Sequence, residues 1–551
     1  MSITVEAAAW AVCGIERHPM TMTDQADHAD HADHRVERRL LTEAYERLRS
    51  AVDGLGEATL PRADRIEDAL AALPRAGQAD YLQPRGARAA LEHIVDTVVP
   101  ALNGQNRSGR YFGFVTGSTL PVAEAADNVV SALDQNVAVH LADETVATAV
   151  EDAALRMLLD VLELGPASEG ESATSTTPWT GRTFTTGATA SNVLALALGR
   201  EAVVNARLKT PDSVATLGLL AACRKADLSD VRILTSMAHS SLYKAASIVG
   251  LGRAAVVDMP ASAAEPWRLD VAAVERALVA ARAAGDHVVH IIAVSAGEVN
   301  TGRFATAGKG DMQRLRMLVD TYGAWLHVDG AFGLFARALP HTDEFARLRE
   351  HADGLELADS ITADGHKVLN VPYDAGIFFS RHGSLQAEVF QNANAAYLTA
   401  APAAPTSTAA TAIASPLNMG IESSRRFRAL PIYAVLLSEG RDGLAAMMVR
   451  MVRLARAIHR FLADSLVYEC LPDHELAEER QTNTHIGVLF RAKDEAVNRD
   501  LAARINATRQ MYVSPTSWQG RPACRVAVSS WRVDVDRDLA VAQEVLSRVV
   551  S

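Results

Sequence analysis

Hydrophobic positions in the middle of the chain follow two alternating patterns. Runs such as VRILTS (231–236) and HVVHIIAVSA (287–296) carry apolar residues at adjacent positions. Between such runs, DVAAVERALVAARAAG (270–285) and DMQRLRMLVDTYG (311–323) carry apolar residues three and four positions apart. Continuous apolar strands that alternate with amphipathic helices are typical of a parallel sheet covered on both faces. The pattern therefore predicts an α/β fold, with functional side chains at the carboxyl ends of the strands.

The same reading divides the chain into four regions. Residues 1–36 contain the repeat ADHADHADH, for which we expect a disordered His- and Asp-rich tail, a metal-binding tract being the alternative. Residues 37–119 have the periodicity of amphipathic helices that need a surface to pack on, and we expect a dimerisation segment. Residues 120–415 should form the large domain, including a long loop of small residues, Thr and Pro. Residues 416–551 should form a small α+β domain.

Composition narrows the class of protein. The 551 residues include 54 Lys and Arg against 66 Asp and Glu, a net charge of −12, which argues against nucleic-acid binding. No apolar run is long enough for a membrane span, and the first residues lack the basic start of a secretory signal. Four cysteines without a CxxC pair favour neither a disulfide framework nor a metal site. We therefore expect a cytoplasmic enzyme without a metal.

Two motifs place ionisable side chains among apolar residues. In DSITADGHKVLNVPYDAG (359–376), Lys367 follows His366, and desolvation could make the lysine amine nucleophilic enough to form a Schiff base with an aldehyde. An ordinary surface lysine is the alternative. In WLHVDGAFG (325–333), Asp329 ends an apolar strand, where a buried carboxylate needs a cation or donor. A protonated pyridine nitrogen would suit it, and so would a structural arginine.

Two further motifs stand before helices. In FTTGATASNVLALALGRE, Gly187, Ala188 and Thr189 lie where backbone N–H groups at a helix start can bind a phosphate. The alternative is an ordinary N-cap for the helix. In SMAHSSLYKAASIVG, His239 follows a strand, and its imidazole could stack on a planar heteroaromatic ring or simply be a satisfied polar residue.

In this order, the phosphate loop, His, Asp and Lys resemble the group II pyridoxal-phosphate-dependent amino-acid decarboxylases, from about Tyr111 to the C-terminus. That family includes glutamate, aromatic amino-acid, histidine and diaminobutyrate decarboxylases. The resemblance implies fold type I with a mostly parallel seven-stranded sheet, pyridoxal 5′-phosphate as cofactor, and a homodimer. It also implies a carboxy-lyase that converts an L-amino acid, not identified by the sequence, to an amine and CO₂.

The resemblance further implies roles for single residues. Lys367 would hold the cofactor as a Schiff base with His366 beside it, and Asp329 would keep the pyridine nitrogen protonated, which sustains the electron sink. His239 would stack over one ring face, and Ala331 would pack beneath the other. The phosphate would be bound by Gly187, Ala188 and Thr189.

Three more residues are implied to act on the substrate. Tyr397 lies about thirty positions after the lysine, where relatives carry a tyrosine that supports protonation of the α-carbon. Relatives that release an aldehyde tend to have Phe there, so Tyr397 favours decarboxylation over oxidative deamination or transamination. Arg525 would bind the α-carboxylate, and Thr116 would line the substrate pocket. Val368 and Gly330 depart from the family's Trp and Ala, which leaves the substrate open. A protein that binds the cofactor without catalysis is the remaining alternative.

Overall fold

The computed structural model describes residues 26–167, 177–392 and 413–550, which form two compact units. The first unit comprises residues up to 55 together with 62–102, and the second comprises 56–61 and 103–551. Tyr397 lies outside the described residues.

The first unit is helical, as the periodicity predicts. Ion pairs between Arg47 and Glu92 (3.2 Å) and between Arg88 and Glu43 (2.7 Å) connect its first and third helices. The first helix begins at Ala26, so residues 26–36, which we expected in a disordered tail, are helical. Alanine at every third position explains the difference, because alanine is the strongest helix former. The elements are α1 (Ala26–Gly54), α2 (Ala63–Ala72), α3 (Ala87–His93), η1 (Ile94–Val98) and η2 (Val99–Ala101).

The second unit is built on the predicted seven-stranded sheet, with strand order β2-β8-β7-β6-β5-β3-β4. Neighbouring strands from β7 to β4 are parallel, whereas β8 is antiparallel to both β7 and β2. This confirms the mostly parallel α/β fold. The strands are β2 (Gly181–Thr185), β3 (Asp230–Thr235), β4 (Val256–Asp258), β5 (Val288–Ser295), β6 (Trp325–Asp329), β7 (Ser360–Asp364) and β8 (Gly376–Ser380).

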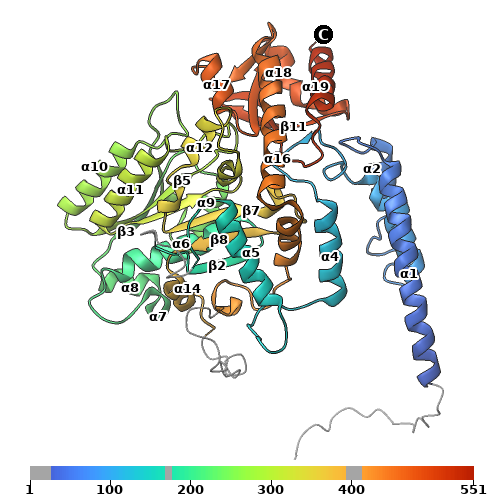
Figure 1. The fold of residues 1–551 in the computed structure, drawn as a ribbon, viewed down its shortest axis with the longest axis horizontal. Coiled ribbons are helices and arrows are strands. Elements are labelled where there is room, and N and C mark those ends of the chain that lie inside the picture. The colour runs from blue at the N-terminus through green and yellow to red at the C-terminus, as the bar shows by residue number, and fades with distance from the viewer. Residues whose placement is uncertain (1–25, 168–176, 393–412, 551) are drawn as a thin grey trace, which may run out of the picture. The chain divides into compact units, whose positions relative to one another are not determined.

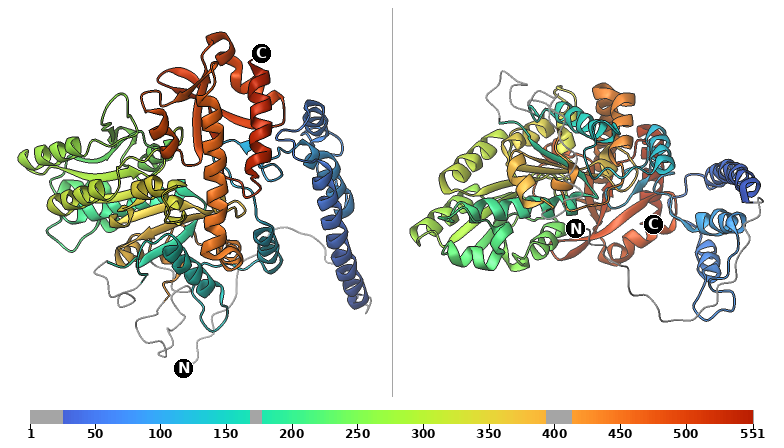
Figure 2. Two further views of the ribbon diagram at one scale, coloured as in Figure 1. Left: turned by 45° about the horizontal axis from the view of Figure 1, so that its top comes forward. Right: turned by 90° about the horizontal axis from the view of Figure 1, so that it is seen from below.

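Helices cover both faces of this sheet (Figures 1 and 2). Along β5, Ile291 and Ala293 belong to one hydrophobic core, and Ile292 and Val294 belong to the other. This alternation explains why the strand carries apolar residues on both faces. The first core is shared with α6 (Ala188–Asn205), α8 (Leu219–Lys225) and α9 (Ser240–Ile248); the second is shared with α5 (Ala147–Val161), α10 (Val271–Ala283) and α11 (Lys309–Tyr322).

Further helices and turns belong to the same unit. They are α4 (Pro121–Leu133), α7 (Val214–Leu217), η3 (Arg253–Ala255), η4 (Gly333–Ala338), α12 (Ala346–Ala352), η5 (Leu355–Leu357), α13 (Gly365–Val368), α14 (Gly383–Val389) and η6 (Pro416–Asn418).

A five-stranded sheet, with order β1-β11-β12-β10-β9, forms the C-terminal part. Strand β1 pairs in parallel with β11, Tyr111 opposite Tyr512, so the last residues of the predicted helical segment 37–119 contribute a strand here. The strands are β1 (Tyr111–Phe112), β9 (Tyr468–Leu471), β10 (Gly487–Ala492), β11 (Tyr512–Trp518) and β12 (Arg521–Ala527). The helices are α16 (Ala429–Ala463), α17 (Ala477–Asn483), α18 (Glu495–Ala507) and α19 (Val535–Val549).

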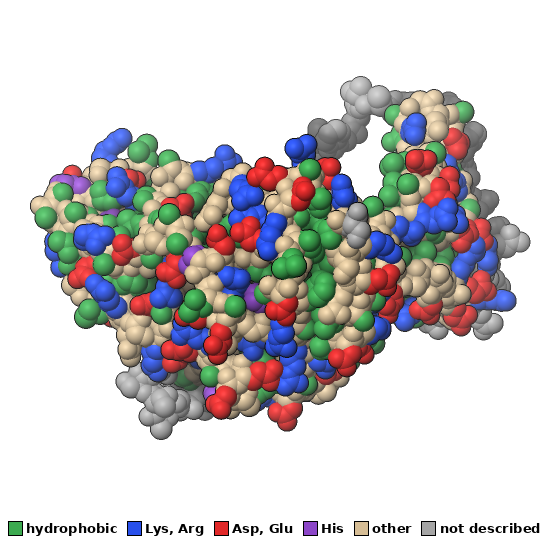
Figure 3. Space-filling model, turned by 90° about the horizontal axis from the view of Figure 1, so that it is seen from above, with side chains coloured by type: hydrophobic (Ala, Val, Ile, Leu, Met, Phe, Trp, Pro, Cys, Tyr) green, Lys and Arg blue, Asp and Glu red, His purple; other side chains and the backbone are tan. Residues whose placement is uncertain are grey.

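Charged side chains of both signs are interspersed over the face of the molecule shown in Figure 3. Surface ion pairs such as Arg453 with Glu344 (2.7 Å) each contribute about 0–1 kcal/mol. Among the described helices, none is long and apolar enough to cross a membrane.

Candidate active site

A cavity of about 310 Å³ lies at the carboxyl ends of β5, β6 and β7. This is the edge of the sheet at which the sequence predicted functional side chains. The cavity has the size of a small-molecule site. Its wall includes the predicted residues Gly187, Ala188, Thr189, His239, Asp329, Ala331, His366 and Lys367.

Lys367 extends into this cavity from α13, the single turn that follows β7. Its Nζ lies 2.9 Å from Oδ2 of Asp364, whose side chain is only 3% exposed. The second oxygen of Asp364, Oδ1, accepts the backbone N–H of Ala188 at 2.6 Å. Asp364 therefore connects the lysine to the first turn of α6. Sequence reasoning missed this residue, although it ends a buried strand inside the lysine motif.

The predicted phosphate loop forms the N-terminus of α6, with Gly187 as the N-cap. The φ angle of Gly187 is 149°, in a region that favours glycine, and an added Cβ would lie 3.3 Å from the His366 ring. A glycine N-cap supplies no side-chain acceptor, so the ordinary side-chain N-cap, which was the alternative, is not formed. The first N–H groups of a helix lack intrahelical partners and favour an anion. This arrangement fits a phosphate group.

Asp329 is oriented by a network of buried polar side chains. Asn192 donates from Nδ2 to Asp329 Oδ2 at 2.8 Å, and the Ala331 N–H donates to Oδ1 at 3.3 Å. The Asn192 Oδ1 accepts from Nε2 of His327 at 2.9 Å, and His327 Nδ1 accepts from the Ser360 hydroxyl at 2.9 Å. Burial lowers the pKa of His327 to about 4, so the ring is neutral. The carboxylate of Asp329 is thus fixed toward the cavity.

The imidazole of His239 lies at the N-cap of α9 and lines the cavity. Its Nδ1 accepts the backbone N–H of Ser241 at 3.2 Å and lies 2.7 Å from the Ser241 hydroxyl. Since Nδ1 is an acceptor, the neutral ring carries its proton on Nε2. Burial is the main cause of the lowered pKa of His239, whereas the negative charge of Asp329 raises that pKa. A neutral, oriented imidazole suits stacking on a planar ring.

His366 and Ala331 complete the wall around the lysine. The His366 Nδ1 accepts the Ala375 N–H at 3.2 Å, and its ring lies 4.3 Å from the ring of Tyr373. Burial lowers the pKa of His366. The carbonyl of Ala331 accepts a hydrogen bond from the backbone N–H of Asp364 at 3.0 Å. This bond connects the backbones at the ends of β6 and β7.

The two substrate-binding candidates are not part of the cavity wall. Arg525, on β12, is buried and donates to the carbonyl of Val299 at 2.8 Å, so it lies directly behind a residue of the wall. Its Nε has no partner among the described residues. Thr116 donates to the Gly113 carbonyl at 3.1 Å, and its own carbonyl accepts from Ser529.

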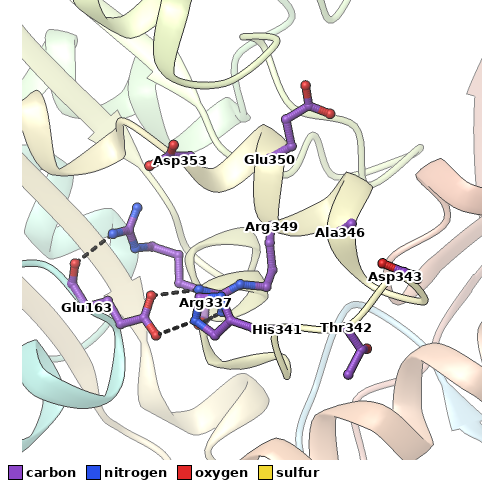
Figure 4. Close-up of a pocket in the computed structure, with 9 residues that line it drawn as sticks. All are labelled: Glu163, Arg337, His341, Thr342, Asp343, Ala346, Arg349, Glu350 and Asp353. Carbon is purple, nitrogen blue, oxygen red and sulfur yellow. Dashed lines mark hydrogen bonds and ion pairs between the residues drawn. The ribbon is translucent and has the colours of Figure 1, made fainter.

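A second cavity, of about 520 Å³, contains none of the predicted residues (Figure 4). Within its wall, Glu163 binds Arg349 at 2.6 Å and His341 at 3.0 Å. Arg337 pairs with Glu356 at 2.8 Å. Within the described ranges, no group of three or more His, Cys, Asp or Glu residues could hold a metal ion.

Pyridoxal phosphate fits the residues of the first cavity. An amine (Lys367), an anion-binding helix terminus (Gly187 to Thr189), an oriented carboxylate (Asp329) and a neutral imidazole (His239) surround one small space. These are the groups needed for the aldehyde, the phosphate, the pyridine nitrogen and the ring face, respectively.

The fold is shared with solved structures. The crystal structure of Oryza sativa TDC with PLP and tryptamine matches with a TM-score of 0.70 at 21% identity, covering 96% of this chain and 99% of that one. Mouse CSAD matches with a TM-score of 0.72 at 17% identity, covering 93% and 98%.

The conserved domain described as "Pyridoxal-dependent decarboxylase conserved domain" matches residues 91–479, and the chain belongs to this family. L-2,4-diaminobutyrate decarboxylase of Acinetobacter baumannii is 26% identical over 377 residues, 66% of this chain and 67% of that protein. The enzyme of the same name from Rhizobium meliloti is 30% identical over 342 residues, covering 61% of this chain and 57% of that protein. The resemblance found in the sequence is therefore confirmed.

Proposed function

We propose that this protein is a pyridoxal-phosphate-dependent carboxy-lyase that converts an L-amino acid to its amine and CO₂, with the cofactor attached at Lys367. The observation that carries this proposal is the meeting of Lys367, Asp329, His239 and the α6 N-terminus in one cavity. Membership of the decarboxylase family supports the reaction type.

Each residue of the cavity has a physical task in this proposal. Pyridoxal phosphate, when bound, supplies a ring that withdraws the electrons left at the α-carbon by CO₂. Asp329, held by Asn192, keeps a proton on the pyridine nitrogen. His239 would contact the ring face as a neutral group and would add no competing charge. The amine of Lys367 would hold the aldehyde of the cofactor.

Proton return to the α-carbon is assigned to Tyr397, which lies outside the described residues. We propose that its hydroxyl supports this step, as the tyrosine at this place does in the family. Oxidative deamination remains the second outcome of the same site.

The substrate is a further proposal. Curated relatives are named for 2,4-diaminobutyrate, tryptophan, aspartate and histidine, so the family name does not select one amino acid. We propose that Arg525 binds the α-carboxylate of the substrate. Its guanidinium donates to the backbone carbonyl of Val299, so the segment around Val299 has to move aside first. A homodimer and a cytoplasmic location also remain predictions.

Borohydride reduction tests the attachment site. Pyridoxal phosphate is added to the purified protein, reduced with borohydride, and mapped by peptide mass spectrometry. We expect the label on Lys367 and none in the Lys367→Ala variant, whereas Lys309→Ala, which removes an exposed lysine of α11, should be labelled like the wild type. A label on another lysine would refute the proposal.

Product analysis tests the reaction. The four amino acids named above are incubated with the loaded protein, and CO₂, amine, aldehyde and ammonia are measured. Equal amounts of CO₂ and amine support decarboxylation. Aldehyde and ammonia in equal amounts would instead establish the oxidative alternative.

A further inference from the structure

The carboxylate of Asp364 occupies the N-terminus of α6, where the proposed function places the cofactor's phosphate. Oδ1 accepts the Ala188 N–H at 2.6 Å, and Oδ2 is 2.9 Å from the Nζ of Lys367. The side chain is 3% exposed, so water scarcely solvates it. A helix N-terminus attracts one anion through its N–H groups and its dipole. Here the protein itself supplies an anion.

Cofactor binding puts both partners of Asp364 under competition. A phosphate would bind the same N–H groups of α6, and the aldehyde would engage the nitrogen of Lys367. Two anions in one buried site repel each other, and a buried carboxylate that loses its cation is costly. The carboxylate must therefore move away, find another cation or become neutral.

The other ionisable groups around the cavity offer Asp364 no permanent cation. His366 Nε2 lies 3.7 Å from Oδ1, but burial lowers its pKa. His239 is likewise kept neutral by burial, and Asp329 is a second carboxylate. Burial raises the pKa of Tyr373 to about 12, so its phenol is neutral. The backbone of Asp364 is held in place, since its N–H donates to the Ala331 carbonyl at 3.0 Å.

We propose that Asp364 takes up one proton when the phosphate binds, and that it then donates a hydrogen bond to the phosphate instead of competing with it. The inference rests on the proposed function. The proton comes from solvent, and the carboxylate becomes a carboxylic acid, so one proton is bound for each cofactor loaded. Because binding takes up a proton, the affinity for pyridoxal phosphate should fall as pH rises. The chain's own carboxylate thereby couples cofactor occupancy to pH.

The Asp364→Asn variant tests this coupling, because an amide donates N–H to a phosphate without taking up a proton. The dissociation constants of pyridoxal phosphate and of pyridoxal, which has no phosphate, are measured by absorbance for both proteins between about pH 6.5 and 8.5. For pyridoxal phosphate, the wild-type to variant ratio should rise toward about tenfold per pH unit. For pyridoxal, which engages Lys367 but brings no phosphate to the α6 N-terminus, the ratio should rise less steeply with pH.

A matched control is Asp359→Asn, which changes a buried carboxylate just before the opposite end of the same strand, outside the cavity wall. For this control, the ratio of the wild-type to the variant dissociation constant for pyridoxal phosphate should not depend on pH. A ratio for Asp364→Asn that is flat within twofold would overturn the inference. So would weaker binding by this variant at every pH, because the carboxylate would then be assisting the phosphate as it stands.

The wild-type protein alone supplies a second measurement if the variant does not fold. Calorimetric titration in two amine-free and phosphate-free buffers with different heats of ionisation counts the protons taken up. We expect more protons to be taken up with pyridoxal phosphate than with pyridoxal, and equal counts would refute the inference. Failure of borohydride to trap the cofactor on Lys367 would refute the proposed function instead. Trapping combined with equal proton counts would refute only the role of Asp364.

Discussion

Replacing Asn192 by alanine removes the side chain that orients the carboxylate of Asp329. Asn192 is fully buried, and its amide makes three contacts. It donates to Asp329 at 2.8 Å and to the Ser241 hydroxyl at 3.2 Å, and it accepts from His327 at 2.9 Å. Because the side chain touches Asp329 rather than the cavity, we regard Asn192 as a positioning residue.

The cost follows from these contacts. A hydrogen bond to a charged group contributes about 1.5–3 kcal/mol, and a buried donor left without a partner costs about 1–3 kcal/mol. Loss of the amide leaves Nε2 of His327 unpaired and Asp329 without its strongest donor. We expect a total loss of about 3–5 kcal/mol in the free energy of unfolding. The share at Asp329, about 1.5–3 kcal/mol, corresponds to a fall in kcat of about 10- to 150-fold.

The assay compares urea unfolding, cofactor absorbance and kcat with those of a matched control. Asn498→Ala also removes a buried amide with two backbone contacts, to Pro522 (2.9 Å) and Ala492 (3.1 Å), but it lies on α18 outside the cavity wall. Both variants should lose stability, and only Asn192→Ala should lose kcat and change the absorbance of the bound cofactor. Equal kcat values for the two variants would refute the positioning role.

Three further changes test other parts of the structure. Gly117→Ala should reduce cofactor attachment at least tenfold, measured by borohydride trapping, because the new Cβ would lie 2.0 Å from the carbonyl oxygen of Lys367. Arg425→Met should lower the free energy of unfolding in urea by about 3–5 kcal/mol, since it leaves buried Glu151 without its partner at 3.0 Å. Burial lowers the pKa of His485 to about 3, so this residue makes the folded protein less stable as pH falls below about 6.5. Between pH 7 and pH 5, the His485→Phe variant should lose about 2 kcal/mol less of its free energy of unfolding than the wild type, measured by urea unfolding at both pH values.

Much of the fold could be predicted because the apolar periodicity is local. The runs that became β3, β5 and β6 are apolar on both faces, and the structure uses both faces. The direction of β8 was not predicted, since GIFFS (376–380) is as apolar as its parallel neighbours. Its antiparallel pairing follows from the short connection after β7, because a parallel pair needs a crossover of a dozen or more residues.

The candidate site shows where sequence reasoning ends. Residues with conspicuous chemistry in a recognisable order, such as Lys367 and Asp329, were identified and lie in one cavity. His327 could have been found as well, since it stands two positions before Asp329 and so shares its face of β6. Asn192 could not, because its partners Asp329 and His327 come from strand β6, more than a hundred residues away.

The two carboxylates at the carboxyl edge acquire different chemistry from the register of their strands. In the pairing of β6 with β7, Asp329 lies opposite Thr362, so Asp364 extends two residues further along the same face. At about 3.3 Å per residue, this offset is large enough to put Asp364 at the N–H groups of α6, while Asp329 stays beside Asn192, one turn into the helix. The first position favours competition with a phosphate, and the second favours pairing with a protonated ring nitrogen. In the sequence, both residues are simply aspartates that end strands; the two-residue offset between the strands gives them separate tasks.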